Sequence, residues 1–133
     1  PVPELVGHDG VSFTPHLGAS TSEAEENCAM MAADQLIDFI ETGNITNSVN
    51  FPSVSMGVRR GIRLAVVNKN VPGMLGQITS LLAAKGVNVA DLINKSRNEL
   101  AYNLIDIEQD LDGDLLSSLR SLDNVMSVRI ISD

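Results

Sequence analysis

The chain has 133 residues, and its 17 acidic residues outnumber its 9 basic ones, which gives a formal net charge of -8 at pH 7. This charge argues against a nucleic acid or an anionic membrane as partner, and the length fits one domain, or a small domain with an appendage. No apolar run approaches the roughly 20 residues that cross a bilayer, nothing resembles a signal peptide, and a single cysteine excludes an internal disulfide.

We therefore expect a cytoplasmic protein, because a reducing compartment suits a chain without disulfides. We predict no metal site. The chain starts at Pro1 rather than at a methionine, which we interpret as a sign of a fragment or a processed product.

The first 21 residues predict little regular structure. Residues 1–10 contain two prolines and two glycines without periodicity, which is typical of irregular surface chain. Residues 11–14 form a short apolar run that stops at Pro15, and this pattern predicts a strand. His16 follows on a glycine-containing turn.

A long helix is predicted from about Ser22 to Thr42, with Gly43 as its end. Its start is open by about two residues, because Ser22 with Glu25 and Ser20 with Glu23 both fit a capping box. Apolar and small residues fall near one side: Ala24, Cys28, Met31, Leu36, Phe39 and Ile40. We expect a small buried cysteine at Cys28, and a helix that packs against another copy of the chain or is poorly ordered.

Residues 44–60 look like a connector, because Asn, Ser, Pro52 and Gly57 interrupt scattered apolar residues. Phe51 is expected to anchor part of it. Gly57 is our candidate hinge, although an ordinary turn glycine explains it equally well.

From residue 61 the pattern predicts the order βαββαβ. Ile62, Leu64 and Val66 alternate as one strand face, and further strands are expected at residues 87–94, 102–108 and 125–131. One helix follows Pro72 and ends at Gly86, and a leucine stripe at Leu111, Leu115, Leu119 and Leu122 marks the other. The predicted fold is α+β and ferredoxin-like: one antiparallel sheet with both helices on one face. Its small core makes pairing with a second copy a reasonable expectation.

The loop between the first strand and its helix is the candidate binding site. Pro72 suits the first turn of a helix, and free amides at a helix N-terminus suit a small anion such as a carboxylate. Asn68 and Asn70 are predicted on the rim of this loop, and Asn88 just beyond the far end of the helix. An asparagine that bonds its own backbone explains Asn70 about equally well.

Two segments resemble known families. The runs NVPG at 70–73 and GVNV at 86–89 resemble the signature of ACT domains, small modules that bind amino acids and regulate metabolic enzymes. The run TPHLGAST at 14–21 is similar to the end of the catalytic core of NAD-dependent 2-hydroxyacid dehydrogenases. The run VNFP at 49–52 sits where a similar run joins these two parts in D-3-phosphoglycerate dehydrogenases. The resemblance implies a catalytic remnant at 1–43, a linker at 44–60 and an ACT domain at 61–133.

For catalysis, the resemblance matches His16 to the histidine that takes the hydroxyl proton of the substrate while hydride passes to NAD. An imidazole suits this role because its ordinary pKa of about 6.5 lies near working pH. The catalytic Arg and Glu and the nucleotide fingerprint of the family would all lie before Pro1. We therefore expect NAD in the full-length enzyme, none bound to this fragment, and no dehydrogenase activity from the fragment alone.

For regulation, the resemblance implies that L-serine binds between two paired ACT domains and controls the enzyme allosterically. Asn70 and Asn88 match two effector-binding asparagines, and Val71, Pro72 and Gly73 belong to the same loop. Asn68 departs from the family, since serine-inhibited relatives have a histidine there, so the identity of the effector stays open. A homodimer or higher oligomer is expected. The alternatives are an ACT-type module that pairs subunits without a ligand, and the tail of another 2-hydroxyacid dehydrogenase.

Overall fold

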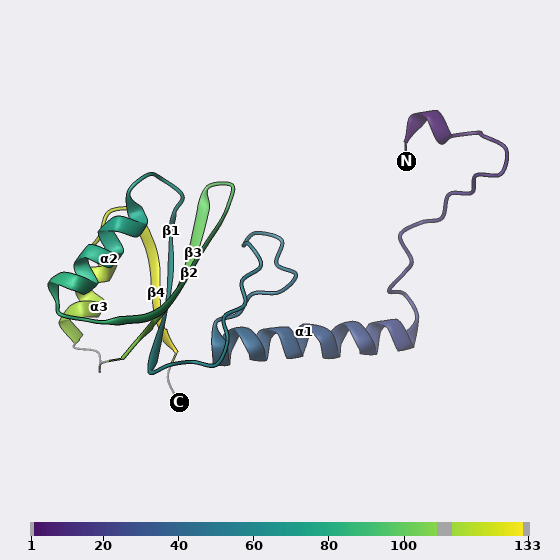
Figure 1. Cartoon of the computed structure of the whole chain (residues 1–133). Helices are drawn as coiled ribbons and strands as arrows, with labels where there is room; N and C mark the ends of the chain where they lie inside the picture. Colours follow the sequence, from purple (N-terminus) through teal and green to yellow (C-terminus); the bar gives the residue numbers. More distant parts are fainter. Residues whose placement is uncertain (1, 109–112, 132–133) are drawn as a thin grey trace. The chain divides into compact units, whose positions relative to one another are not determined.

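The protein is described here by a computed structural model that covers residues 2–108 and 113–131 (Figure 1). Its contacts divide the chain inside the first long helix into two units, Pro1–Asp34 and Gln35–Asp133. Among the described residues, no helix combines the length and the apolar content that spanning a membrane requires.

The N-terminal unit contains one short 3-10 helix, η1 (Pro3–Leu5), in a segment predicted to be irregular. Residues 11–14 form no strand, so that prediction is wrong. A β-prone run needs a neighbouring strand to receive its backbone hydrogen bonds, and among the described residues the only sheet lies in the other unit.

The long helix α1 (Ser22–Thr42) is confirmed with the predicted bounds. Its N-cap is Thr21, whose Oγ1 accepts the amide of Ala24 at 3.1 Å, so neither predicted capping box forms. Cys28 is exposed rather than buried, because no described helix or strand of its unit covers this half of α1. Several apolar side chains of α1 are exposed as well: Met30, Met31, Leu36, Ile37 and Ile40. The expected packing against another copy stays a prediction.

The C-terminal unit confirms the ferredoxin-like order. Its elements are β1 (Ile62–Lys69), α2 (Met74–Ala84), β2 (Val89–Arg97), β3 (Leu100–Ile107), α3 (Gly113–Arg120) and β4 (Val125–Ile131). The strands form one sheet in the order β2-β3-β1-β4, and every neighbouring pair is antiparallel. Both helices cover one face of this sheet (Figure 1).

Strand ends differ from the prediction by a few residues. β2 begins and ends later than expected, and β3 begins at Leu100 because a tight turn at Asn98 and Glu99 joins the two strands. Asn98 has a positive φ of 54°, a conformation that asparagine tolerates better than most residues. The predicted helical residue Leu111 lies outside the described residues, and α3 is described from Gly113.

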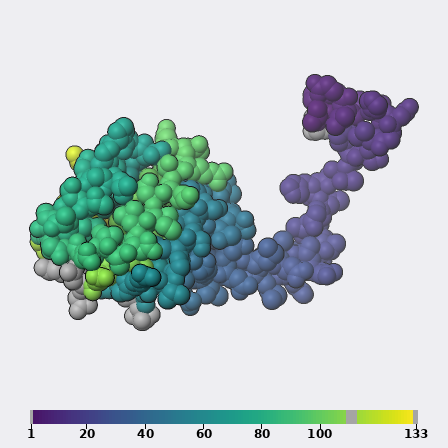
Figure 2. Space-filling view, in the orientation of Figure 1, coloured from purple at the N-terminus to yellow at the C-terminus, as the bar shows by residue number. Residues whose placement is uncertain are grey.

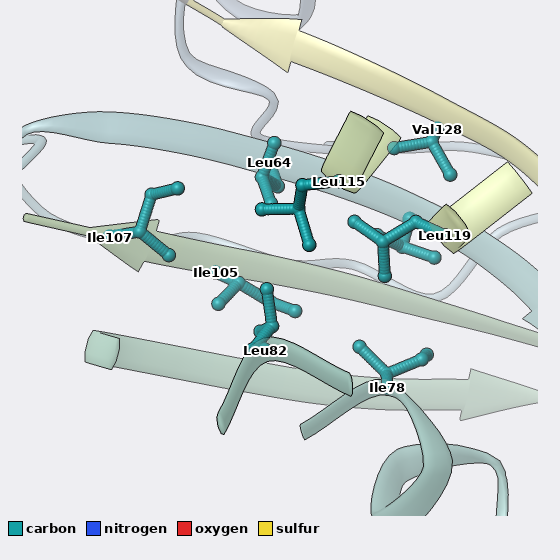
Figure 3. Close-up of a cluster of buried hydrophobic side chains, with 9 residues drawn as sticks. Leu64, Ile78, Leu82, Ile105, Ile107, Leu115, Leu119 and Val128 are labelled. Carbon is teal, nitrogen blue, oxygen red and sulfur yellow. The ribbon is translucent and has the colours of Figure 1, made fainter. Parts of the chain in front are cut away.

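The helix-facing core uses the alternating strand positions and the helix stripes that the sequence predicted. Figure 3 shows aliphatic side chains from β1, β3, β4 and both helices meeting in one cluster. The buried members are Leu64, Val66, Ile78, Leu82, Ile105, Ile107, Leu115, Leu119 and Val128. Burying each such side chain contributes roughly 1.5 to 3 kcal/mol, so this cluster dominates the stability of the unit.

The other face of the sheet is covered too, by the connector 44–60. Ile45 and Val54 form an isolated antiparallel bridge, and both side chains are buried together with Met56. Phe51 packs edge-to-face on Tyr102 of β3, with 6.0 Å between ring centroids, which agrees with the predicted anchoring role. In Figure 2 the connector, in blue-teal, lies directly against the green strands.

Candidate functional site

The candidate site begins with the loop between β1 and α2. Gly73 is the N-cap of α2 and has a left-handed φ of 87°, which glycine adopts at little cost. Pro72 therefore precedes the N-cap instead of lying in the first turn. No side chain caps the helix, and the first-turn amides of an α-helix have no intrahelical acceptor. The start of α2 can therefore receive a carboxylate.

The loop amides before Gly73 are less available than the sequence suggested. The amide of Asn70 donates to the carbonyl of Glu99 at 2.8 Å, and the amide of Val71 donates to the carbonyl of Lys69 at 2.9 Å. These bonds fix the loop to the β2–β3 turn. Only the amides at the start of α2 are left for an anion.

Asn70 is exposed, and its Nδ2 donates to the carbonyl of Asn98 at 3.0 Å. Beside it lies a hollow of about 380 Å³, within the size range of small-molecule sites. The hollow is lined by Lys69, Asn70, Val71, Asn98, Glu99, Leu100 and Met126. The Oδ1 of Asn70 can accept a bond from a ligand ammonium.

Asn68 lies beneath the loop, not on its rim. Its side chain is 2% exposed. Its Nδ2 donates to the carbonyl of Lys69 at 2.7 Å, and its Oδ1 accepts from Nδ2 of Asn103 at 2.7 Å. Both ends of the amide are therefore bonded to the protein, which leaves little of it for a ligand.

Asn88 lies at the opposite end of the sheet from Asn70. It immediately precedes β2, and its Nδ2 donates to Oε2 of Glu108 at 2.7 Å, just after the end of β3. A strand of this length spans about 25 to 30 Å. One chain therefore does not bring the two predicted effector asparagines together.

The remaining predicted residues lie elsewhere. His16 is exposed in the N-terminal unit, within a segment without helix or strand, and its catalytic role stays a prediction. Gly57 has no positive φ, and its carbonyl accepts Nη2 of Arg63 at 2.8 Å. This bond secures the candidate hinge in the described conformation.

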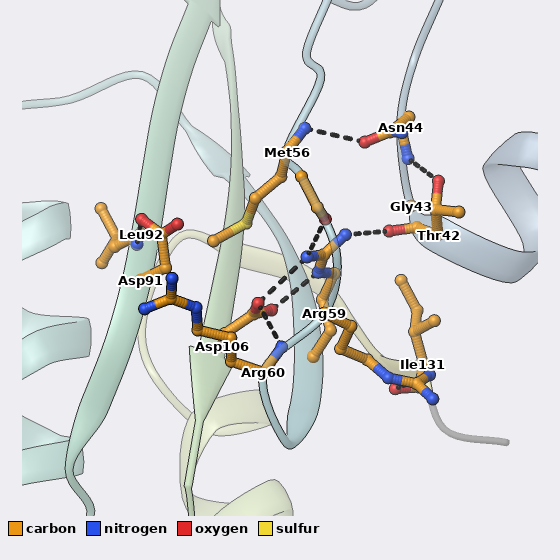
Figure 4. A network of polar contacts seen from close by, with 12 residues as sticks. Thr42, Gly43, Asn44, Met56, Arg59, Arg60, Asp91, Leu92, Asp106 and Ile131 are labelled. Atoms are coloured by element: carbon orange, nitrogen blue, oxygen red, sulfur yellow. Dashed lines mark hydrogen bonds and ion pairs between the residues drawn. The ribbon is translucent and has the colours of Figure 1, made fainter.

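A buried ion pair that the sequence analysis missed joins the connector to the sheet. Arg63 on β1 and Asp106 on β3 are each 1% exposed, and Nε of the arginine lies 2.7 Å from Oδ1 of the aspartate. A second bond, from Nη2 to Oδ2 at 3.0 Å, makes the pair bidentate. Asp106 also accepts the amide of Arg60, and Arg63 donates to the carbonyl of Thr42 at 3.0 Å (Figure 4).

The last turn of α1 is held by further donors from the sheet. Arg129 on β4 donates to the carbonyl of Phe39 at 2.6 Å, and its guanidinium lies 4.3 Å from the centre of the Phe39 ring. The hydroxyl of Tyr102 donates to the carbonyl of Gly43 at 2.7 Å. Positive charge at a helix C-terminus is favourable. Burial raises the pKa of the Tyr102 phenol above its ordinary value, against the opposing effect of Arg129.

The strand order and register define an α+β protein of the ferredoxin-like, ACT type, with its candidate site at the β1–α2 loop. Comparison with known proteins confirms the resemblance predicted from the sequence. The chain is 34% identical over 129 residues to D-3-phosphoglycerate dehydrogenase of Escherichia coli K12, which covers 96% of this chain and 32% of that enzyme.

Other relatives with this name are similar to a comparable extent. D-3-phosphoglycerate dehydrogenase of Haemophilus influenzae is 31% identical over 92% of the chain, and D-3-phosphoglycerate dehydrogenase 2 of Saccharomyces cerevisiae is 31% identical over 96% of it. The chain spans about a third of the length of these curated relatives, between 29% and 32%.

Solved structures with a similar fold include two regulatory proteins. The ACT domain from GTP pyrophosphokinase of Chlorobium tepidum covers 53% of this chain and 96% of its own, with 20% identity and a TM-score of 0.45. The regulatory subunit of aspartate kinase from Thermus thermophilus covers 62% of this chain and 57% of its own, with 15% identity and a TM-score of 0.48. No protein-family model matches the chain.

Proposed function

We propose that this chain is the regulatory end of an NAD-dependent D-3-phosphoglycerate dehydrogenase, which oxidises 3-phosphoglycerate to 3-phosphohydroxypyruvate at the start of serine synthesis. Its C-terminal unit binds an amino acid, with L-serine as the first candidate, between two copies of the chain. The similarity along 96% of the chain to D-3-phosphoglycerate dehydrogenases supports the first part of this proposal. The separation of Asn70 from Asn88 supports the second.

Pairing through β2 explains how two distant asparagines can serve one ligand. β2 is an edge strand, and an open edge can receive a strand of another chain. A two-fold axis at this edge makes the two β2 strands antiparallel. The start of β2 in one chain, beside Asn88, then lies near the end of β2 in the other chain, where Asn98 accepts the bond from Asn70. Two equivalent sites result.

The groups at each site match the charges of an amino acid. The uncapped start of α2 offers amides to the α-carboxylate. Asn70 of one chain and Asn88 of the other provide amide oxygens for the ammonium group and amide hydrogens for the side chain of the ligand. Because the hollow beside Asn70 is open and polar, a small polar amino acid fits better than a bulky apolar one.

The effect of the ligand would leave the regulatory unit through the end of α1. Arg63 and Arg129 bond carbonyls of the last turn of α1 from two different strands, so a change in sheet pairing moves this helix end with it. Control of catalysis also requires that the ligand has different affinities for the two arrangements of the pair.

The chain does not fit a nucleotide cofactor. All strand pairs of the described sheet are antiparallel, whereas the dinucleotide fold needs a parallel strand-helix-strand unit with a glycine-rich turn. NAD would therefore bind to a part of the enzyme outside this chain. With 3-phosphoglycerate and NAD, the purified chain should form no NADH by absorbance, and measurable turnover would contradict this assignment.

Calorimetry with L-serine tests the effector role directly. We expect heat and saturation at or below millimolar concentrations with the wild-type chain, and loss of both in Asn70→Ala and in Asn88→Ala. A chain that shows no heat with serine or related amino acids at millimolar concentrations would exclude an effector role.

The second candidate is a module that pairs subunits without sensing a ligand. It is favoured by the internal bonds of Asn70 and Asn68, which satisfy groups that a ligand would otherwise need. Sedimentation of the two alanine variants separates the candidates. Loss of serine binding with pairing retained supports sensing, whereas wild-type pairing without any serine response supports the module.

A further inference from the structure

Three asparagines form a ladder of hydrogen bonds across the helix-facing side of the sheet. Asn94 on the edge strand β2 pairs in register with Asn103 on β3, and its Nδ2 donates to Oδ1 of Asn103 at 2.6 Å. The Nδ2 of Asn103 donates to Oδ1 of Asn68 at 2.7 Å and to the carbonyl of Val66 at 3.2 Å. Asn68 in turn donates to the carbonyl of Lys69. The ladder thus ends at the first residue of the candidate loop.

Every amide in this ladder donates in the same direction, toward the loop. Asn103 is fully buried and Asn68 is 2% exposed, while Asn94 is exposed. Buried polar groups that lose a partner are costly, so the two buried amides fix each other's orientation. An Asn68 that turned its oxygen toward Lys69 would face a carbonyl, and its amide would face the Nδ2 of Asn103. The ladder therefore admits one orientation.

The carbonyl of Lys69 is the point where the ladder acts. It accepts both the Nδ2 of Asn68 at 2.7 Å and the amide of Val71 at 2.9 Å. The Lys69 amide donates to the carbonyl of Asn124, and the next amide, that of Asn70, donates to the carbonyl of Glu99. Fixing the Lys69 carbonyl therefore fixes the peptide plane that leads into Asn70.

We propose that Asn68 and Asn103 are positioning residues of the amino-acid site. They do not contact the ligand, and they set the conformation of the loop that presents Asn70. This inference rests on the proposed function for its ligand, but its structural part concerns the loop of the free chain. It also assigns a role to Asn68 that differs from the direct effector contact that the resemblance implies.

Asn103→Asp provides a test that responds to pH. A carboxylate at this position only accepts, so Asn68 must turn its amide toward it and loses its bond to Lys69. Burial raises the pKa of a carboxyl group, and the protonated acid can again donate to Oδ1 of Asn68. The loop of this variant should therefore be loose at pH 8 and regain order near pH 5, whereas the wild-type loop should not respond over this range.

Two further variants complete the design. Asn94→Asp makes the same change in charge at the exposed end of the ladder, where the new carboxylate can turn to water, so the loop should keep its wild-type order. Asn68→Ala removes the bond to Lys69 at every pH, so its loop should be loose at pH 5 and at pH 8. It also keeps the inference testable if a buried carboxylate at position 103 prevents folding.

The measurements are hydrogen-exchange protection of the Val71 amide by NMR and L-serine affinity by calorimetry, both at pH 5 and pH 8. We expect at least about tenfold loss of protection and about tenfold weaker binding for Asn103→Asp at pH 8, the effect of one net hydrogen bond. Both losses should reverse at pH 5 in this variant only. In a chain with the Asn68→Ala change they should persist.

The possible outcomes separate the two proposals. Unchanged protection in Asn68→Ala or in folded Asn103→Asp would overturn the inference, and so would lost protection with unchanged serine affinity. If the wild-type chain binds no amino acid, the proposed function fails. The protection data then still decide whether the ladder fixes the loop.

Discussion

At the scale of single residues, the ion pair of Arg63 and Asp106 has the largest energetic consequence. Both side chains are 1% exposed, and the bidentate contact leaves neither charge without a partner. Removing one member of a buried pair leaves the other charge desolvated and uncompensated, which costs far more than the loss of a surface pair.

We expect Asp106→Asn to lower the free energy of unfolding by about 3 kcal/mol or more. The matched control is Asp114→Asn, because Asp114 pairs with Lys85 and the two side chains are 64% and 39% exposed. The control should cost less than about 1 kcal/mol. Urea unfolding of both variants measures this difference. Equal losses would mean that the buried pair does not hold the sheet and the connector together.

Tyr102 makes stability depend on alkaline pH. Burial raises the pKa of its phenol above the ordinary value of about 10, so the fold favours the protonated form. This contribution is complete below about pH 10 and is lost as the pH rises through the folded-state pKa. Thermal unfolding from pH 8 to pH 11 should show the loss. In Tyr102→Phe the curve should start lower, by about 1 kcal/mol for the bond to Gly43, and fall less steeply.

The sequence could not reveal these residues, because its alternation was read for one face only. Ile62, Leu64 and Val66 were correctly predicted to face the helices, which left Arg63 and Asp106 on a face that looked like a solvent face. Nothing in residues 44–60 has a period that predicts a covering layer. Charge complementarity between neighbouring strands was the one available signal.

At the scale of elements, the junction between α1 and the connector is tightly constrained. Gly43 has a left-handed φ of 79°, and a Cβ atom there would lie 2.6 Å from Cδ1 of Ile131 and 2.7 Å from Cδ2 of Leu104. The end of α1 at this glycine was predicted correctly from the sequence. The close approach to the sheet was not, since it depends on how the connector folds back.

Gly43→Ala should therefore destabilise the chain by about 3 kcal/mol, through backbone strain and overpacking together. Gly57→Ala is the control, because its φ is not positive and no atom lies within 4 Å of the added methyl. The control should change the free energy of unfolding by less than about 0.5 kcal/mol. If both variants unfold at the same urea concentration, α1 does not dock on the sheet as described.

Elements with strong periodicity were the most predictable part of the fold. β1, α2, α3 and β4 follow from regular apolar spacing, although their ends moved by a few residues. The strand predicted at residues 11–14 failed, because propensity alone cannot provide a neighbouring strand. The cap of α1 moved to Thr21, since several hydroxyl residues in a row compete for the same role.

At the scale of the whole molecule, the candidate site is distributed over two ends of the sheet. The residue types for an amino-acid ligand were predictable from the loop and the resemblance. Their placement was not, because strand length separates Asn70 from Asn88 within one chain, and Asn68 lies beneath the loop. The account therefore depends on a second copy paired through β2.

Complementation between two inactive variants tests that claim most directly. In a mixed pair of Asn70→Ala and Asn88→Ala chains, one site carries both substitutions and the other carries neither. Calorimetry with L-serine should show no binding for either variant alone, and should show binding with wild-type affinity at one site per mixed pair after the two are combined. If the mixture binds no serine while the wild-type chain does, the site is not shared between two chains.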